Sequence, residues 1–389
     1  MINLINDSPD SESFLYITPY LREVNRIKGD CKQKHFYEPD TQYGHGSKYR
    51  DLQKMLSDGR NIVSTHALFM KFNETVEAII SAKGYSLALD ESFSPLTTRN
   101  IKKDDFDMLK RDGNIEVDLR GFIHWLKPTY DGVWDWMKYY ADKNCLMLSG
   151  NGDSLDKSVI VTVWLFPIDV LRAFKQIYVM TYKFGGSLLY SYLKMHGMDY
   201  ELMSMDDSYN IVPYDINIEI VDRKRASKLI NICTSDNLNA IGDSYYALSK
   251  SWFSKRENQP LVEILKGNLY NWYRNVVHTK SDEALWTTFS AYKHAIQGKG
   301  FTKGFIECNA RAVNEYRQRS KLAYCLNRFE VPTYVNLFQH NGIIVNEDEL
   351  GLSDLIQWVW RGAIREGNPI ELYLPSSRMR GLLTSWLQT

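Results

Sequence analysis

The sequence has no excess charge of either sign, because 47 lysine and arginine residues are balanced by 47 aspartate and glutamate residues. This balance does not exclude a nucleic-acid partner, but any basic surface must then be local. Cysteine is scarce, and there is no C-x-x-C pair and no nearby histidine at metal-ligand spacing. Free thiols in a reducing cytoplasm are therefore expected at the five cysteines, Cys31, Cys145, Cys233, Cys308 and Cys325.

Long hydrophobic runs are absent as well. The longest, such as residues 159–167, are far too short to span a bilayer, and the N-terminus has no signal-peptide pattern. The sequence contains no internal repeat and no low-complexity linker. With 44% hydrophobic and 24% charged residues, the composition is typical of a globular protein. A length of 389 residues favours two domains with additional material, at about 150 residues per domain.

Strands and helices are predicted to alternate in the first part of the chain. Apolar runs at 13–21, 61–66 and 85–89 predict buried strands, and the segment 67–82 predicts a helix. This alternation predicts a parallel sheet in an α/β domain. Ligands of such sheets bind beyond the carboxyl ends of the strands. The residues at those ends are Thr18, Pro19, Thr65, His66, Asp90 and Glu91.

The acidic pair Asp90-Glu91 closes the third predicted strand. Two carboxylates at a strand end suit a nucleotide-bound Mg²⁺, with Asp90 holding the metal and Glu91 orienting the attacking water. The alternative is a surface turn, which is where most Asp-Glu dipeptides occur.

A hairpin and a second α/β unit are predicted next. Segments on either side of Asn151-Gly152 predict two strands joined by a tight turn. A strand at 176–182 then leads into Gly185-Gly186-Ser187 and a helix. This turn could bring backbone N–H groups to a phosphate, but a serine N-cap explains it equally well.

Residues 223–297 are predicted to be mainly helical and combine aromatic with basic side chains. Such a mixture can stack bases and follow a phosphate backbone, although aromatic residues more often form a core. The aromatic and basic residues concerned are Tyr245, Tyr246, Trp252, Phe253, Lys255, Arg256, Tyr270, Trp272, Tyr273, Arg274, His278, Lys280 and Trp286. The strand pattern resumes at 303–309 and again at 370–375.

Residues 353–367 predict one helix with two different faces, with Ser353 as its N-cap. Gln357, Arg361 and Arg365 are predicted to lie one turn apart on the polar face, which also contains Trp358. Two fixed guanidinium groups suit a phosphate or the charge of a transition state. The alternative is an ordinary solvated surface.

In this order, the segments resemble the two-domain core of superfamily 2 helicases, in particular a phage-type DEAD/DEAH-like helicase. The resemblance covers nearly the whole chain. Residues 14–19 resemble motif Ia, 62–66 motif Ib, 87–91 the Walker B motif II, 178–186 the motif IV strand and turn, 305–316 motif V, and Gln357 with Arg361 part of motif VI.

This resemblance implies two RecA-like domains with ATP and Mg²⁺ in the cleft between them. It assigns the catalytic roles to Asp90, which also holds the metal through the nucleotide, Glu91, Gln357, Arg361 and Arg365. It implies nucleic-acid contacts at Thr18, Pro19, Thr65, His66, Thr181, Gly185, Gly186, Asn309 and Arg311.

The chain departs from the family pattern in three places. Trp360 replaces the glycine before the first motif VI arginine, and Arg365 follows four residues after Arg361 where the family has three. Ser92 and Phe93 replace the usual end of motif II. No G-x-x-x-x-G-K-[ST] phosphate loop occurs anywhere in the sequence. Since residues 1–6 resemble the end of the helix that follows this loop, the chain is expected to begin just downstream of it, with ATP hydrolysis impaired.

We therefore predict an α/β fold of two RecA-like parallel-sheet domains, 1–166 and 167–389, with a helical insertion at about 223–297 in the second. The first hypothesis is a phage-encoded ATP-dependent helicase or translocase core acting in DNA replication or recombination, complete only with an upstream phosphate loop. The second is a non-catalytic remnant that binds nucleic acid or a protein partner. The third is a metal-dependent nuclease using Asp90, Glu91 and other acids. DNA ranks ahead of RNA as the partner, no membrane is involved, and the bacterial host cytoplasm is the expected location.

Overall fold

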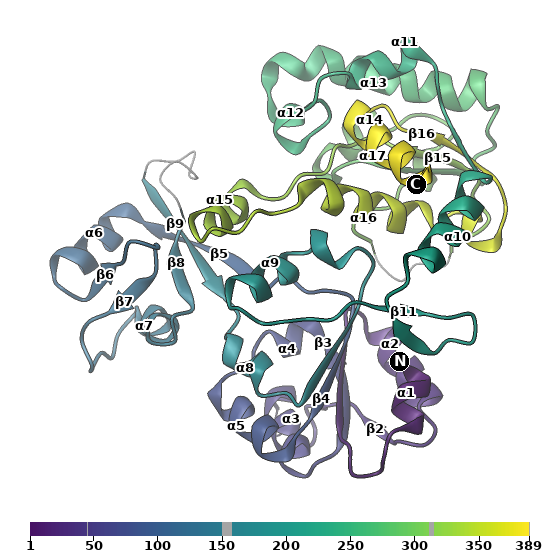
Figure 1. The fold of residues 1–389 in the computed structure, drawn as a ribbon. Helices are drawn as coiled ribbons and strands as arrows, with labels where there is room; N and C mark the ends of the chain where they lie inside the picture. The colour runs from purple at the N-terminus through teal and green to yellow at the C-terminus, as the bar shows by residue number, and fades with distance from the viewer. Residues whose placement is uncertain (45, 150–157, 311–314, 389) are drawn as a thin grey trace. The chain divides into compact units, whose positions relative to one another are not determined.

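The chain folds into two compact units, each built around a parallel sheet (Figure 1). The computed structural model describes residues 1–44, 46–149, 158–310 and 315–388. Unit 1 comprises Met1–Glu201, Met205–Val212 and Val331–Val345, and unit 2 comprises Leu202–Ser204, Pro213–Glu330 and Asn346–Thr389. The predicted α/β class with two parallel-sheet domains is confirmed.

The sheet of unit 1 has five parallel strands in the order β10-β4-β1-β3-β2. Its central strands are continuous apolar runs because both faces are covered by helices. The strands are β1 (Phe14–Thr18), β2 (Phe36–Tyr37), β3 (Asn61–Thr65), β4 (Ser86–Asp90) and β10 (Gln176–Met180).

Helices cover the two faces of this sheet (Figure 1). Strand alternation turns Phe14 and Tyr16 toward α1 and α2, and Leu15 and Ile17 toward the opposite face. The helices are α1 (Ile2–Asp7), α2 (Leu21–Asp30), α3 (Lys48–Ser57), α4 (His66–Phe69), α5 (Glu74–Lys83), α8 (Ile168–Arg172), α9 (Leu188–Met195) and α15 (Pro332–His340). Among the described residues, none of the helices is long and apolar enough to cross a bilayer.

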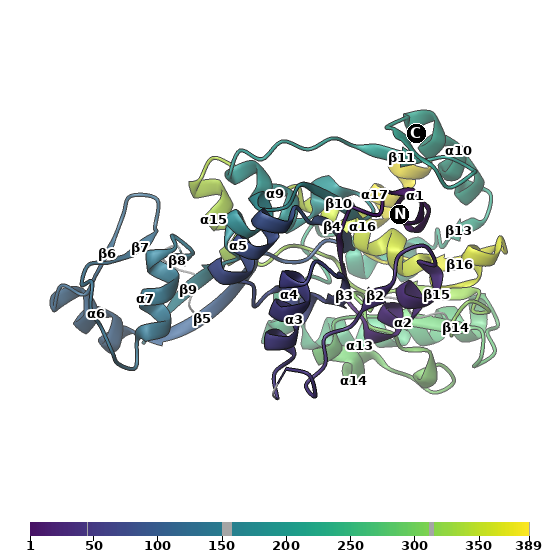
Figure 2. The same cartoon turned by 90° about the horizontal axis from the view of Figure 1, so that it is seen from below.

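An antiparallel subdomain is inserted between β4 and β10 with an apolar cluster of its own. Figure 2 shows its helices and hairpin around the sheet β5-β9-β8. Its elements are β5 (Leu96–Lys102), α6 (Lys103–Arg111), β6 (Ile115–Val117), β7 (Ile123–Trp125), α7 (Asp135–Asp142), β8 (Leu146–Leu148) and β9 (Val159–Leu165). Antiparallel pairing of β8 with β9 confirms the two strands of the predicted hairpin, while its turn at Asn151-Gly152 lies outside the described residues.

The strand Gln176–Met180 lies in a different sheet from the one expected. The sequence pattern assigned it to the second domain, but β10 pairs in parallel with β4, and Met180 stands beside Asp90. The subdomain at 96–165 folds by itself and returns the chain to the first sheet, which a local pattern does not reveal. Unit 1 therefore continues past the expected boundary at residue 166.

The sheet of unit 2 has four parallel strands in the order β13-β16-β15-β14. The strands are β13 (Ile230–Ile232), β14 (Ala284–Thr287), β15 (Lys321–Tyr324) and β16 (Ile370–Tyr373). The helical insertion occupies the connection from β13 to β14, so it is narrower than predicted. The helices of unit 2 are α10 (Ile216–Ser227), α11 (Asp236–Asn239), α12 (Lys250–Ser254), α13 (Gln259–Asn271), α14 (Lys293–Ile296), α16 (Glu347–Val359) and α17 (Ser377–Gln388).

The strand expected at 303–309 does not form. Phe305 makes only an isolated bridge to Trp286, and β15 at Lys321–Tyr324 takes the sheet position beside β14. A Cβ atom on Gly304 would lie 2.3 Å from the Ala284 carbonyl oxygen, so the chain passes β14 at a distance that only glycine permits.

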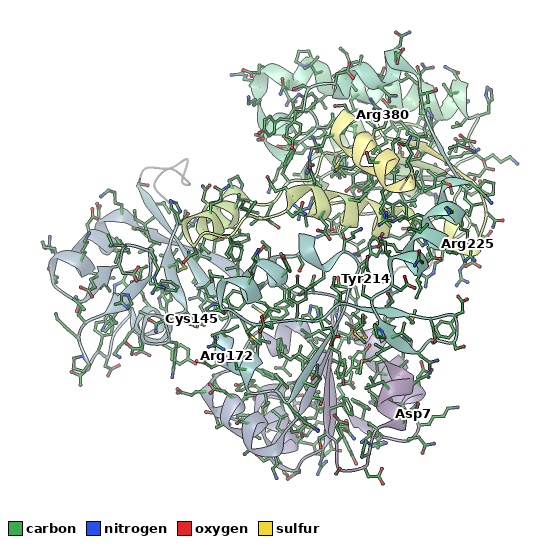
Figure 3. All side chains as sticks on the ribbon, in the orientation of Figure 1. Asp7, Cys145, Arg172, Tyr214, Arg225 and Arg380 are labelled. Atoms are coloured by element: carbon green, nitrogen blue, oxygen red, sulfur yellow. The ribbon has the colours of Figure 1, made fainter. Side chains whose placement is uncertain are left out.

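His196, at the end of α9, makes the stability of unit 1 dependent on pH. The pKa of His196 is lowered to about 4, mainly by burial and also by nearby Arg172, labelled in Figure 3, while Asp169 opposes the shift. Its ring packs 4.5 Å from that of Tyr192, and its Nε2 has no hydrogen-bond partner among the described residues. The unfolded chain therefore binds a proton more readily than the folded one between about pH 6.5 and 4.

The stability contributed by neutral His196 is thus present above about pH 6.5 and is lost as the pH falls toward 4. His196→Gln is expected to reduce this acid loss by about 1 kcal/mol, a figure discounted for partial exposure. Urea unfolding at pH 7 and pH 4.5 measures it, with exposed His35→Gln as the control. Equal acid losses in wild type and His196→Gln would contradict the assignment.

Candidate functional site

Polar residues of unit 1 converge at the carboxyl edge of its sheet. The parallel register sets Thr18 beside Thr65 at the ends of β1 and β3. It also sets Met180 beside Asp90, so that Thr181 and Glu91 follow at the ends of β10 and β4. Residues far apart in the sequence therefore meet because parallel strands end at the same edge.

Asp90 is held in place by Thr18 of the neighbouring strand β1 and by His66, which follows β3. The hydroxyl of Thr18 donates to its Oδ2 at 3.1 Å, and Thr18 itself is fully buried. His66 Nε2 lies 3.2 Å from the Asp90 carbonyl oxygen, and only a protonated nitrogen can donate to that acceptor. Burial raises the pKa of Tyr16, and the Asp90 charge raises it further. The Asp90 carboxyl group is thus fixed in position at the sheet edge.

Glu91 leaves the strand in an unusual backbone conformation. Its φ of 67° lies in the left-handed region, which non-glycine residues seldom adopt. Its N–H donates to the Met180 carbonyl at 2.9 Å, and the Thr181 hydroxyl donates to its Oε2 at 3.3 Å. Left-handed residues held by their surroundings occur often at functional sites. The bond from β10 fixes the direction of the second carboxylate.

Phe93 lies where the resemblance to helicases would have the polar end of motif II. Its ring lies 5.3 Å from those of Phe69 and Phe166, and 6.3 Å from His66. This position is therefore part of the apolar core beneath the site, where a polar residue would lack partners.

The carboxylate pair suits a metal that comes with its own ligands. Among the described residues, no three His, Cys, Asp or Glu side chains are grouped so as to hold a metal ion by themselves. A nucleotide-bound Mg²⁺ needs only one or two protein carboxylates, because phosphates and water complete its shell. Asp90 and Glu91 could therefore be the protein ligands of such a metal–nucleotide complex.

The turn at Gly185 and Gly186 has a structural explanation. Phe184–Gly186 forms a short 3₁₀ turn, and Ser187 then caps α9 by accepting the Tyr190 N–H at 3.1 Å. A serine N-cap was one of the two interpretations of this turn.

Pro19 follows β1 directly and is half-buried.

The helix expected at 353–367 is shorter and begins earlier. Helix α16 runs from Glu347 to Val359, with Asn346 rather than Ser353 as its N-cap. Beyond it the backbone of Gly362 is extended, and a Cβ atom there would lie 2.9 Å from the Arg319 carbonyl oxygen. The helix must therefore stop before this close approach.

Gln357, Arg361 and Arg365 consequently do not share one helical face. Gln357 lies on α16 and donates to the Ser353 hydroxyl at 3.2 Å. Arg361 follows the end of α16 and is 8% exposed, whereas Arg365 is exposed in the 3₁₀ turn Ala363–Glu366. Trp358, expected on the polar face, is fully buried against Tyr324. The solvated-face alternative is therefore wrong for Arg361.

Two predicted nucleic-acid contacts belong to the segment that follows Phe305. Asn309 is exposed beyond the bridge at Phe305. Arg311 lies outside the described residues.

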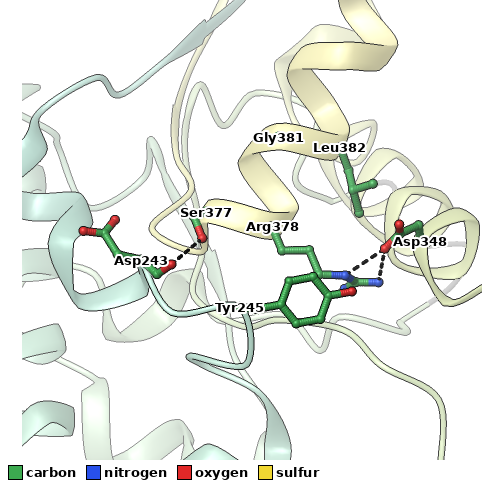
Figure 4. Close-up of a pocket in the computed structure, with 7 residues that line it drawn as sticks. All are labelled: Asp243, Tyr245, Asp348, Ser377, Arg378, Gly381 and Leu382. Carbon is green, nitrogen blue, oxygen red and sulfur yellow. Dashed lines mark hydrogen bonds and ion pairs between the residues drawn. The ribbon is translucent and has the colours of Figure 1, made fainter.

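Sequence reasoning missed a hollow of about 370 Å³ in unit 2 (Figure 4). Asp243, Tyr245, Asp348, Ser377 and Arg378 line it, and they come from three separate segments. The sequence held two signals, namely Tyr245 among the aromatic residues that could stack bases, and the position of Ser377 and Arg378 after the last strand.

Comparison with known proteins places these elements in one family. Residues 224–387 match the model of the YonV C-terminal Rossmann-like domain, and residues 96–162 match the YonV middle domain. The second match coincides with the inserted antiparallel subdomain. A curated relative, the SPbeta prophage-derived uncharacterized protein YonV of Bacillus subtilis (strain 168), is 41% identical over 401 residues, which cover 100% of this chain and 95% of that protein.

Two solved structures are also similar to this chain. The structure of S. tokodaii Xpd4 is 15% identical with a TM-score of 0.41, and the match covers 96% of this chain and 88% of that one. The DUF1998 helicase MrfA bound to DNA and AMPPNP is 11% identical with a TM-score of 0.32, and the match covers 100% of this chain and 45% of that one. With the curated relative matched over 95% of its length, the chain belongs to the YonV family.

Proposed function

We propose that this protein is the core of an ATP-dependent nucleic-acid helicase or translocase. The observation that carries the proposal is the pair Asp90 and Glu91, fixed at the carboxyl edge of a parallel sheet by threonines from two neighbouring strands. Asp90 would hold the Mg²⁺ of bound ATP, and Glu91 would orient the attacking water. Thr18 and Thr181 would position these carboxylates.

The residues around this edge give the second part of the proposal. Pro19, Thr65 and His66 follow neighbouring strands, where a nucleic-acid strand could pass over the sheet. Separately, we propose a phosphate-contacting role for Gln357 and for Arg361 or Arg365 of unit 2, on their hydrogen-bonding groups and charge alone. DNA is proposed ahead of RNA, since the relative is prophage-derived.

A second function is favoured by one feature of the sequence. Residues 1–389 contain no G-x-x-x-x-G-K-[ST], whose backbone N–H groups and lysine would hold the β- and γ-phosphates. Hydrolysis would then need a phosphate loop from outside these residues. Without one, the protein would be a helicase-like module that binds nucleic acid or a protein partner without turning over ATP.

Nucleic-acid-stimulated ATP hydrolysis tests the two functions. The protein expressed from its own gene is assayed for phosphate release with Mg²⁺-ATP, alone and with single-stranded DNA or RNA. The motor hypothesis expects hydrolysis at least about tenfold faster with the preferred strand, since coupling of nucleotide and nucleic-acid sites is a free energy of about 1–3 kcal/mol. Binding of a nucleic-acid strand without binding of nucleotide would support the module instead. If the protein bound neither a strand nor nucleotide, both functions would be refuted.

A further inference from the structure

The hollow in unit 2 lies at the point where the connections of the sheet diverge. From β13 the chain crosses to β14 at the far edge, and it returns through β15 to β16, which pairs with β13. Ala323 and Tyr373 pack in the cluster that contains α13, while Tyr324 packs on Trp358 of α16. The connections thus leave β13 and β16 toward opposite faces (Figure 1). Such switch points are where open α/β sheets bind ligands.

The loops that follow β13 and β16 meet closely at this place. A Cβ atom on Gly242 would lie 2.0 Å from the Pro375 carbonyl oxygen, and the Ser377 hydroxyl donates to the Asp243 carbonyl at 3.1 Å. The loops therefore form a fixed rim. A volume of about 370 Å³ lies at the lower end of the ~300–1,000 Å³ typical of small-molecule sites.

Aromatic rings lie exposed at the hollow. Tyr245 is 53% exposed and Tyr246 is 64% exposed, and their ring centroids are 4.9 Å apart. Both contact Phe329, at 5.8 Å and 5.4 Å. Large aromatic side chains are seldom left in water as a cluster, and they provide surfaces on which planar ligands stack.

Arg378 supports this cluster but is not available to an anion. Each of its three nitrogens is bound to acceptors among the described residues by hydrogen bonds or an ion pair. These are Asp348 Oδ1 for Nε and one terminal nitrogen, and Asn327 Oδ1, the Arg328 carbonyl and the Glu347 carbonyl for the rest. Its guanidinium lies 4.2 Å from the Phe329 ring centre and 5.8 Å from that of Tyr245. Phosphate would therefore meet two carboxylates and no uncommitted guanidinium.

The remaining chemistry favours a neutral planar ligand that donates hydrogen bonds. In Figure 4 the Asp348 carboxylate faces Arg378 beside the Tyr245 ring, and the exposed Asp243 side chain lies on the other side, turned away from the ring. Asp243 is exposed, and Asp348 receives both bonds from Arg378 on Oδ1, which leaves its other oxygen as an acceptor among the described residues. A cationic side chain is disfavoured, because the Arg378 guanidinium already lies at the ring. Carboxylates accept well from the exocyclic amine of cytosine.

We infer that this hollow binds an unpaired nucleobase bearing an exocyclic amine, stacked on Tyr245 and hydrogen-bonded to Asp243 or Asp348. The inference rests on the proposed nucleic-acid function and adds base recognition by the second domain. The same chemistry could come from a free nucleoside or from a single strand. Thymine, which has a carbonyl in place of the amine, is expected to bind less well.

Fluorescence anisotropy with oligo(dC) and oligo(dT) of equal length tests the site. Tyr245→Leu is expected to weaken oligo(dC) binding by at least about fivefold, because stacking contributes ~1–3 kcal/mol per base. Tyr245→Phe keeps the ring and is expected to stay within about twofold of wild type. Tyr214→Leu is the matched control, since Tyr214 is 48% exposed in the same unit and does not line the hollow.

Two further measurements sharpen the test. Asp243→Asn replaces the acceptor by an amide and is expected to reduce the preference for oligo(dC) over oligo(dT). Titration with cytidine tells whether the base comes from a free nucleoside or from a single strand. If cytidine binds saturably and Tyr245→Leu abolishes this binding, the site takes free nucleosides as well as strands.

The outcomes separate this inference from the proposed function. If wild type binds both oligonucleotides and Tyr245→Leu behaves like Tyr214→Leu, the base site is refuted and the nucleic-acid function stands. If wild type binds neither oligonucleotide nor cytidine, both fail. Selective loss in Tyr245→Leu, with Tyr245→Phe unaffected, supports the site.

Discussion

Replacing Arg378 by methionine is expected to lower the free energy of unfolding by about 3–5 kcal/mol, because three acceptors lose their charged donor at about 1–3 kcal/mol each. The Arg378 side chain is only 3% exposed, and it joins the start of α17 to α16 and to the loop after β15. Methionine preserves much of the apolar contact with Phe329 but none of the hydrogen bonds. Asn327, Arg328 and Glu347 would each keep an acceptor without its donor.

Urea unfolding followed by circular dichroism measures this loss. Arg380→Met is the matched control, because Arg380 lies on the same helix in a partly exposed position. Its Nη1 donates to the carbonyls of Leu374 and Pro375 at 2.8 and 3.0 Å, and losing these bonds is expected to cost about 1 kcal/mol. Equal losses in the two variants would show that the Arg378 network contributes no more than an ordinary surface contact.

The sequence predicted the centre of unit 1 because its strands are continuous apolar runs that end in polar residues. Residues 61–65 and 86–90 form strands close to where the pattern set them, and Thr18, His66, Asp90 and Glu91 meet at one edge. A parallel sheet buried on both faces leaves this signal in the local sequence. Their roles in catalysis and in nucleic-acid binding remain predictions.

The pairing of strands that are far apart in the chain left no such signal in the local sequence. Strand β10 belongs beside β4, although about 85 residues and a whole subdomain separate them in the chain. Thr181 was expected to contact nucleic acid, and its bond to Glu91 follows from that pairing. The hollow around Tyr245 was also missed, because its lining comes from loops that only the order of the strands brings together.

The arginines of the second unit show a different limit of prediction from the sequence. Helical periodicity placed Arg361 and Arg365 on one face, but Gly362 between them approaches the Arg319 carbonyl and ends the helix. A hydrophobic pattern describes which residues are buried and does not report such close backbone contacts. The burial of Arg361 instead of Arg365 is therefore a property of tertiary packing.

Glu91→Gln is expected to reduce the rate of nucleic-acid-stimulated ATP hydrolysis by about 10²–10⁴-fold, the usual contribution of a group that takes or directs a proton. Glutamine has the same shape and retains an oxygen that can accept the Thr181 hydroxyl bond, and the backbone bond from Glu91 to Met180 is unaffected. The change therefore removes charge and basicity while the sheet edge keeps its geometry. Nucleic-acid affinity is expected to stay within about threefold, because the proposed strand contacts do not involve this carboxylate.

Glu12→Gln provides the control on the opposite edge of the same sheet. Glu12 precedes β1 and accepts the Ser86 hydroxyl at 2.9 Å, so the same substitution alters an equivalent carboxylate–hydroxyl pair at the amino ends of the strands. Since ligands bind at the carboxyl ends, Glu12→Gln is expected to leave turnover unchanged. Steady-state phosphate release and anisotropy on the same preparations measure both variants. If Glu91→Gln and Glu12→Gln turn over ATP as fast as wild type, Glu91 does not orient the attacking water, and the phosphate chemistry must be sought away from the β4 edge.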